Sequence, residues 1–484
     1  MKLFTNLKLS FVIIVLVANL LFKSAGSANF TAVASGTWSS ATTWGGSAPS
    51  ANVSNDQIRI PTGITVTMDN DVTINGAIAL LEVQGTLTSV SGILIQSSGT
   101  VAGTGTISLG KVILNAGSAF TFSGSVTVNE FKTGVANLLT TAQILVKDKL
   151  VVSAGLLTIN TLGTLTLAAN TTIEMSGGLL ANNGGTIGFA GLYNVIYTSL
   201  SSNTGLELSG SNLNNLTINS PGQTITLSSD LLVKGILALN DGELKLNGRN
   251  ITLAGNFNLQ GSGSIHSTYI SDITINTATT LTSVLRFSSS GNAVKNLVIN
   301  IQDSGYAKLG SDLQVFGVLN FMKGSMHTGD FNLNLGASGS ISGSGSSSYV
   351  ITGANGKLSR NLVAGSTSST MFSVGSSANY TPVKIQLDSG SSSGNVSVNI
   401  SGDVLSNGTT GISLATTKAL VKNTWHITSD MTSGINLNME VMWKSAMEVN
   451  GFNRTEGVLS HYVSGNWDLT AAHQQPHRLM ECLV

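Results

Sequence analysis

Side chains capable of acid–base or metal chemistry are few in this sequence, and they are scattered. Between Ile60 and Val350 the 14 carboxylates occur singly, and the one dense group of charges is Lys147-Asp148-Lys149. Cleaving a polysaccharide requires carboxylates or a basic group gathered at one groove. The sequence therefore predicts no catalytic residue, although distant coils of a repetitive fold can assemble such a site. None of the six histidines has a zinc-binding spacing: His266, His327, His426, His461, His473 and His477.

Carboxylates at expected turns offer oxygen ligands that calcium prefers. They occur in Asp69-Asn70-Asp71 and Asn240-Asp241, neither of which belongs to a complete calcium-binding loop. Asx residues at turns more often accept hydrogen bonds from the backbone. We therefore expect no cofactor, and keep Asp69, Asp71 and Asp241 as weak calcium candidates.

The five tryptophans are the strongest candidates for ligand contacts, because indole rings stack on sugars. Trp38 and Trp44 lie near the N-terminus, six residues apart, and the other three lie near the C-terminus. A tryptophan pair at the entrance of a repeat array more often covers the open apolar face of the first repeat. The ligand-binding candidates are Trp38, Trp44, Trp425, Trp443 and Trp467.

The composition excludes several classes of protein. The 484 residues carry 23 basic and 23 acidic side chains, and charged residues make up 10% of the chain. No basic stripe exists to neutralise phosphates, so we expect no nucleic-acid partner. A single cysteine rules out a disulfide scaffold. A hydrophobic content of 41% with zero net charge favours a folded core over disorder.

The N-terminus is typical of an export signal. Lys2 and Lys8 precede an apolar run from Phe11 to Phe22, and small residues follow from Ser24 to Ala28. This order of basic, apolar and small residues predicts a signal peptide over residues 1–28. The apolar run is shorter than the ~20 residues of a membrane-spanning helix. We expect a secreted protein, extracellular or on a bacterial outer surface, with no membrane span in the mature chain.

The sequence between these residues predicts short strands. Bursts such as Ile64–Met68, Leu165–Leu167 and Leu244–Leu246 alternate apolar and small polar residues, and Asn-Gly or Asp-Gly pairs separate many of them. Alternation with a period of two places the aliphatic residues on one face of a strand. The sequence therefore predicts an all-β protein.

An internal repeat indicates how the strands are arranged. Asn215–Asn219 recurs as Asn296–Asn300, and Ser229–Leu231 recurs as Ser311–Leu313, at offsets of 81 or 82 residues. Shorter units of about 20 residues cannot bury their own apolar faces, so we expect them to stack as coils of a solenoid. At ~4.8 Å per coil, residues 60–350 would span roughly 60 Å. An array of β-sandwiches is the alternative.

Changes in composition suggest the domain boundaries. After the Gly-Ser run at 336–348 the strands lengthen, as in Val383–Leu387, and three tryptophans appear, which suits a β-sandwich. The segment 471–484 matches neither part and predicts a disordered or aberrant tail, from a truncation or a frameshift. The expected order is a signal peptide (1–28), a Trp-containing N-terminal cap (29–61), β-helix repeats (62–350), a β-sandwich module (351–470) and this tail.

Two segments resemble known families. Gly36-Thr37-Trp38, Thr43–Gly46 and Ile60–Thr67 look like the opening of the eight-glycine extracellular domain found in bacterial surface proteins that use type IX secretion. The stretch from Trp425 to Asp468 is similar to a sandwich module often found after the β-helices of such proteins. The resemblance implies a right-handed parallel β-helix of the pectin-lyase-like superfamily, together with adhesion and carbohydrate interaction.

The expected function follows from a long repetitive body with little clustered chemistry. We expect a non-enzymatic, exported β-helix protein that acts as an adhesive or structural spacer. Extracellular glycans or neighbouring cell surfaces are the expected partners. The alternative is a polysaccharide lyase, a glycoside hydrolase or a carbohydrate-binding protein built on the same helix, because a fold alone does not determine activity.

Overall fold

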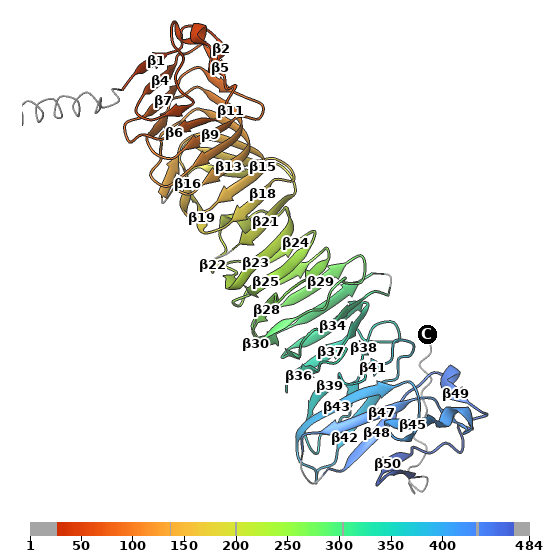
Figure 1. Ribbon diagram of the computed structural model, residues 1–484. Helices are drawn as coiled ribbons and strands as arrows, with labels where there is room; N and C mark the ends of the chain where they lie inside the picture. The colour runs from red at the N-terminus through yellow and green to blue at the C-terminus, as the bar shows by residue number, and fades with distance from the viewer. Residues whose placement is uncertain (1–26, 136, 199–200, 303, 432–434, 469–484) are drawn as a thin grey trace, which may run out of the picture. The chain divides into compact units, whose positions relative to one another are not determined.

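The computed structural model describes residues 27–135, 137–198, 201–302, 304–431 and 435–468. These residues are nearly all-β, with a parallel β-solenoid of about 15 turns and additional sheets near the C-terminus (Figure 1). The all-β and solenoid predictions are confirmed. Most of the predicted signal peptide, and the predicted tail with His473 and His477, lie outside the described residues. The described part contains no helix long and apolar enough to cross a membrane.

The chain divides into two units, which are described separately. Unit 1 holds residues 1–194 with 205–207, and unit 2 holds residues 195–204 with 208–484.

Unit 1 begins its solenoid earlier than the sequence suggests. Residues 29–61, expected to form a cap, contain the first coil. Its three short strands each pair in parallel with a strand of the second coil: β1 (Asn29–Thr31) with β4 (Gln57–Ile60), β2 (Gly36–Thr37) with β5 (Thr65–Thr67), and β3 (Asn52–Val53) with β6 (Val72–Ile74). The 3-10 helix η1 (Ala41–Trp44) is inserted between β2 and β3.

Rows of aliphatic side chains run through the interior of unit 1. Because successive coils pair in parallel and in register, each inward residue lies directly over its equivalent in the previous coil. One row has six members from six coils, all no more than 1% exposed, and burying each such side chain contributes about 1.5–3 kcal/mol: Val66, Leu87, Ile107, Val126, Ile144 and Leu165. They belong to β5, β8 (Thr86–Thr88), β11 (Thr106–Leu114), β13 (Ser125–Thr133), β15 (Gln143–Val152) and β17 (Thr164–Leu167).

Glycines form a second kind of row at one corner of unit 1. A Cβ on Gly105 would lie 2.1 Å from the carbonyl oxygen of Gly85, and a Cβ on Gly124 would lie 2.1 Å from that of Gly105. These carbonyls accept hydrogen bonds from the next coil, at 2.8 Å from Thr106 and 3.0 Å from Ser125. Glycine is therefore required here because adjacent coils come too close for a side chain.

Unit 2 continues the same design. An inward row of Ile225, Leu244, Ile265 and Phe287 lies in register through β23 (Leu213–Thr226), β25 (Leu237–Lys245), β28 (Ser264–Ser267) and β30 (Phe287–Val294). A six-stranded parallel sheet forms another side of the coils: β24 (Leu231–Val233), β26 (Ile251–Leu253), β29 (Ile273–Thr277), β31 (Leu297–Ile301), β34 (Val318–Lys323) and β37 (Ser340–Ser342).

The internal repeat has the same local structure in both copies but lies on different sheets. Asn215 Oδ1 accepts the backbone N–H of Ile236 at 2.7 Å, and Asn296 Oδ1 accepts that of Val318 at 2.8 Å. Nevertheless the first copy belongs to β23, whereas the second belongs to β31 in the six-stranded sheet. The two copies therefore share their local structure, but the period of the repeat is not a whole number of coils.

Parallel pairing gives way to antiparallel pairing at β39 (Leu358–Leu362), past residue 350. One edge of β39 pairs in parallel with β36 (Leu333–Leu335), and the other edge pairs antiparallel with β43 (Gly394–Ser401). This exchange leaves no open sheet edge at that strand. The C-terminal module contains two antiparallel sets of three strands: β39, β43 and β47 (Thr424–Ser429), and β40 (Thr370–Phe372), β42 (Val383–Leu387) and β48 (Leu437–Val441). Three two-stranded antiparallel sheets accompany them in the described residues.

Candidate functional site

The N-terminal tryptophans are buried in the first coils of unit 1. Trp38 is 1% exposed and Trp44 is 7% exposed. Their rings meet edge-on at 5.5 Å, Phe30 packs on Trp44 at 6.5 Å, and Trp44 Nε1 donates to the carbonyl oxygen of Trp38 at 2.8 Å. In this conformation neither indole offers a face to a sugar, and both rings contribute to the start of the core.

The weak calcium candidates bond to the protein itself. Asp69 accepts hydrogen bonds from the backbone and the hydroxyl of Ser39, and the hydroxyl bond lowers the pKa of the Asp69 carboxyl. Asp71 Oδ1 accepts the N–H of Ile93 at 2.9 Å. Asp241 Oδ1 accepts from the Gly242 N–H and the Ser262 hydroxyl. No group of three or more potential metal-ligating side chains occurs in the part of the chain that the structure describes.

The three C-terminal tryptophans are half-buried, and each is fixed by its own hydrogen bond. Trp425 Nε1 donates to the carbonyl of Thr381 at 2.9 Å, just before β42 begins. Trp467 Nε1 donates to the carbonyl of Leu405 at 2.8 Å, and its ring meets Tyr462 at 5.3 Å. In the described residues no ring contact joins two of these tryptophans, so they form separate sites.

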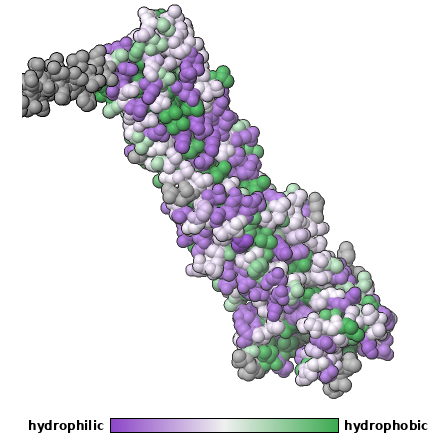
Figure 2. All heavy atoms as spheres, in the orientation of Figure 1, coloured by the Kyte–Doolittle hydropathy of each residue, from purple (hydrophilic) through white to green (hydrophobic). Residues whose placement is uncertain are grey.

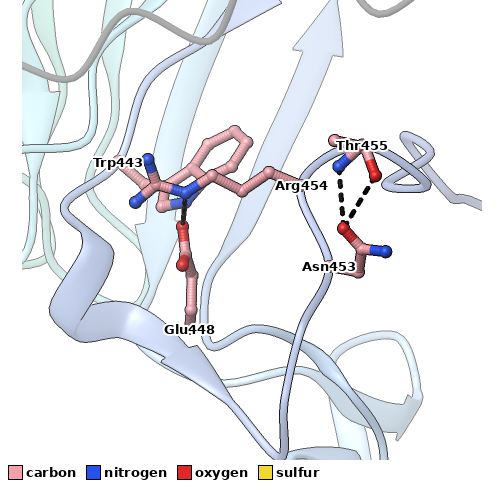
Figure 3. Close-up of polar contacts among 5 residues, drawn as sticks. All are labelled: Trp443, Glu448, Asn453, Arg454 and Thr455. Atoms are coloured by element: carbon pink, nitrogen blue, oxygen red, sulfur yellow. Dashed lines mark hydrogen bonds and ion pairs between the residues drawn. The ribbon is translucent and has the colours of Figure 1, made fainter.

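Trp443 has the surroundings most suited to a ligand. Its Nε1 donates to Glu448 Oε1 at 2.9 Å, and Arg454 Nε donates to the same oxygen at 2.7 Å. Figure 3 shows the Arg454 side chain extending from its loop toward Trp443, with Glu448 below. Phe452 packs edge-on against the indole at 6.2 Å. Glu448 therefore fixes an aromatic ring beside a guanidinium group, a combination that can stack on a sugar and bond to its hydroxyls.

Next to this cluster a short turn is closed by its own side chains. Asn453 Oδ1 accepts from the backbone N–H of Thr455 at 3.1 Å and from its hydroxyl at 2.9 Å (Figure 3). Arg454 lies between these two residues in the chain. The turn therefore helps to hold the guanidinium over Glu448.

Replacing Glu448 with alanine is expected to destabilise the C-terminal module by about 1–3 kcal/mol, because two half-buried donors lose their acceptor. Urea unfolding monitored by tryptophan fluorescence measures this loss, and the emission of the folded variant should shift to longer wavelength as water reaches Trp443. The exposed Glu456 provides the matched control, with an expected change below about 0.5 kcal/mol for Glu456→Ala. Equal effects of the two substitutions would show that Glu448 does not stabilise the module.

One cluster on a lateral face of unit 2 was not predicted from the sequence. His266 Nδ1 lies 3.5 Å from Glu243 Oε2 and 3.2 Å from Ser288 Oγ, and its ring packs against Gly291. A nucleophile relay needs the acid and the serine at opposite nitrogens of the imidazole. Here both approach Nδ1, so the arrangement fits contacts between coils rather than proton transfer. These residues come together because their coils stack, and the length of each coil cannot be read directly from the sequence.

Two half-buried histidines are held neutral. Burial lowers the pKa of His327 to about 4, and the nearby charge of Lys308 is the smaller cause. The ring of Tyr306 stacks on His327 at 4.0 Å. Burial, followed by the charge of Lys357, also lowers the pKa of His426.

These histidines predict a loss of stability in mild acid. The unfolded chain takes up a proton near pH 6.5, whereas folded His327 stays neutral down to about pH 4. Its contribution is therefore complete above pH 6.5 and is lost as the pH falls toward 4. Allowing for partial exposure, the loss is about 1–2 kcal/mol. Thermal unfolding from pH 7 to 4 should show a smaller decline for His327→Gln than for the parent, and an unchanged decline for the exposed His461→Gln.

The comparisons with known proteins do not support the resemblance to pectin-lyase-like and type IX-secreted proteins. The chain matches no protein-family model, no curated protein and no solved structure.

Proposed function

We propose that this protein is an exported, non-enzymatic β-helix protein that serves as an adhesive or structural spacer outside the cell and contacts glycans. The proposal rests on one observation: carboxylates of the solenoid form ion pairs and hydrogen bonds with residues of neighbouring coils. In unit 1 the ion pairs Arg59–Glu82, Lys111–Glu130 and Lys149–Glu174, at 3.1, 2.8 and 2.7 Å, each join residues of different coils.

Unit 2 uses acid and amide side chains for the same purpose. Asp230 accepts the backbone and side-chain N–H groups of Asn250, Asn250 accepts the N–H of Asp272, and Asp272 accepts both groups of Asn296. This Asx ladder, formed by Asp230, Asn250, Asp272 and Asn296, alternates acid with amide. The alternation keeps like charges off adjacent coils, which lie only ~4.8 Å apart. These polar residues thus bond one coil to the next and do not gather at one groove, which suits a spacer.

The sequence and the surface support the extracellular part of the proposal. The basic, apolar and small residues of 1–28 favour export, and the resemblance of residues 36–67 to the opening of exported surface proteins agrees with it. Figure 2 shows hydrophilic residues mixed with separate apolar patches on the visible face. The aromatic site at Trp443 supports contact with glycans.

Enzymatic cleavage of a polysaccharide is the competing function, and Glu243 with His266 is the observation that favours it most. Purified protein would be incubated with a panel of neutral and acidic polysaccharides, and reducing ends and unsaturated uronates would be measured. We expect no product above that of a control without protein. Turnover by the parent would refute the proposal, and its loss in the Glu243→Gln/His266→Ala variant would assign catalysis to the lateral face.

Localisation is tested separately. A strain expressing the tagged chain would be fractionated and labelled with antibody without permeabilisation. The expected result is label on the cell surface or protein in the medium. Retention of the whole protein inside the cell would contradict the proposed role.

A further inference from the structure

Four successive coils of unit 2 place exposed cations and aromatic rings at the same corner. We call this the corner stripe, formed by Arg249, Tyr269, Ile270, Lys295 and Phe316. These residues precede β26, β29, β31 and β34, which pair in that order within the six-stranded sheet. Tyr269 is 62% exposed, Ile270 55% and Phe316 42%. Exposed apolar residues of this size gathered at one place mark a binding surface more often than single ones do.

The apolar side chains of the stripe lie along the surface. The rings of Tyr269 and Phe316 approach to 5.8 Å between centroids, although Lys295 lies in the coil between them. Glycines on the flanking coils make room for these side chains. A Cβ on Gly248 would come within 2.9 Å of Ile270 Cδ1, and one on Gly336 within 3.1 Å of Phe316 Cδ1. The stripe therefore presents a continuous apolar surface across successive coils.

Polar groups of both signs border this surface. Within the described residues neither Arg249 nor Lys295 has a carboxylate at ion-pair distance, unlike the paired cations of unit 1. The adjacent Asx ladder contributes two carboxylates, Asp230 and Asp272. Two cations and two carboxylates leave the corner without net charge, while donors and acceptors lie on both sides of the rings.

We propose that the corner stripe binds a neutral polysaccharide that runs across successive coils. The apolar C–H faces of its sugars would lie on Tyr269 and Phe316, and Arg249 and Lys295 would donate hydrogen bonds to hydroxyl groups. A polyanion would require a net positive surface, and a protein-binding core would contain fewer charges. The inference rests on the proposed function and deepens it by naming a site and a class of glycan.

The test is native affinity electrophoresis of the full chain in gels that contain galactomannan, xylan, hydroxyethyl cellulose or, as the acidic polymer, polygalacturonate. We expect at least one neutral polymer to retard the parent protein. In that gel the Tyr269→Ala/Phe316→Ala variant should bind at least tenfold more weakly. Tyr306→Ala removes an exposed ring from a different sheet and should bind as the parent does. Trp443→Ala removes the ring of the C-terminal site and reports any contribution of that site to the retardation. Circular dichroism and thermal unfolding would confirm that each variant folds.

Each other outcome overturns the inference. Weaker binding only in Trp443→Ala would move glycan contact to the C-terminal module and leave the proposed spacer function intact. Retardation by polygalacturonate alone would exclude a neutral ligand, and migration of the parent unchanged in every gel would exclude the site. None of these results produces a cleaved polysaccharide, which is the result that would refute the proposed function.

Discussion

Replacing Gly105 with alanine is expected to destabilise unit 1 by about 3 kcal/mol or more. The new Cβ would lie 2.1 Å from the carbonyl oxygen of Gly85 and 2.6 Å from the backbone of Gln84, neither of which can turn aside as a side chain does. The two coils would have to separate, and the hydrogen bond from Thr106 to Gly85, now 2.8 Å, would lengthen. Overpacking against backbone at a closely packed site belongs at the upper end of such costs.

Gly188 provides the control in the same unit. It lies in β20 (Thr186–Phe189), and a Cβ there would meet no heavy atom within 4 Å. Gly188→Ala is therefore expected to be neutral or to stabilise by up to about 1 kcal/mol, because alanine restricts the unfolded chain. Urea midpoints of the two variants and the parent give the comparison. A Gly105→Ala midpoint as high as that of Gly188→Ala would show that the coils are further apart than the structure places them.

The sequence predicts the strands well because their signal is local. Alternation in Ile64–Met68 and the glycines between strands indicate which side chains face inward, and the structure buries Val66 and Met68 and half-buries Ile64. Stacking also follows from the sequence, since units of about 20 residues cannot enclose a core alone. These inferences need no knowledge of which strand pairs with which.

Contacts that depend on the length of each coil could not be predicted from the sequence. The 81-residue repeat suggests whole coils, yet its copies, Asn215–Asn219 and Asn296–Asn300, lie on different sheets because corner insertions vary. For the same reason the sequence does not bring Tyr269 to Phe316, or Glu243 to His266, across coils that differ in length.

The tryptophans show the same limit at the level of sites. The sequence favours a covering role for Trp38, which is buried, but does not reveal that Trp443 is fixed beside Arg454. A tryptophan covered by its own chain and a tryptophan at the surface look alike in the sequence. Only the partners of the Nε1 group and the exposed area distinguish a core residue from a ligand contact.

Replacing Leu244 with alanine is expected to cost unit 2 about 2–5 kcal/mol, because the side chain is fully buried between its register partners Ile225 and Ile265. In a stacked coil the cavity weakens the contacts to the coils on both sides, so the loss concerns two interfaces at once. Leu244→Met nearly preserves the volume and should cost less than about 1.5 kcal/mol.

The neighbouring Lys245 points outward in the same strand, so Lys245→Ala changes the same coil without touching the inward row and should stay within about 0.5 kcal/mol of the parent. Urea unfolding measured by circular dichroism gives all three values. If Leu244→Ala and Lys245→Ala had the same midpoint, the inward aliphatic rows would not be what stabilises the stack. The Asx ladder and the ion pairs would then have to account for the stability of the stack. These contacts are too exposed to water to supply it.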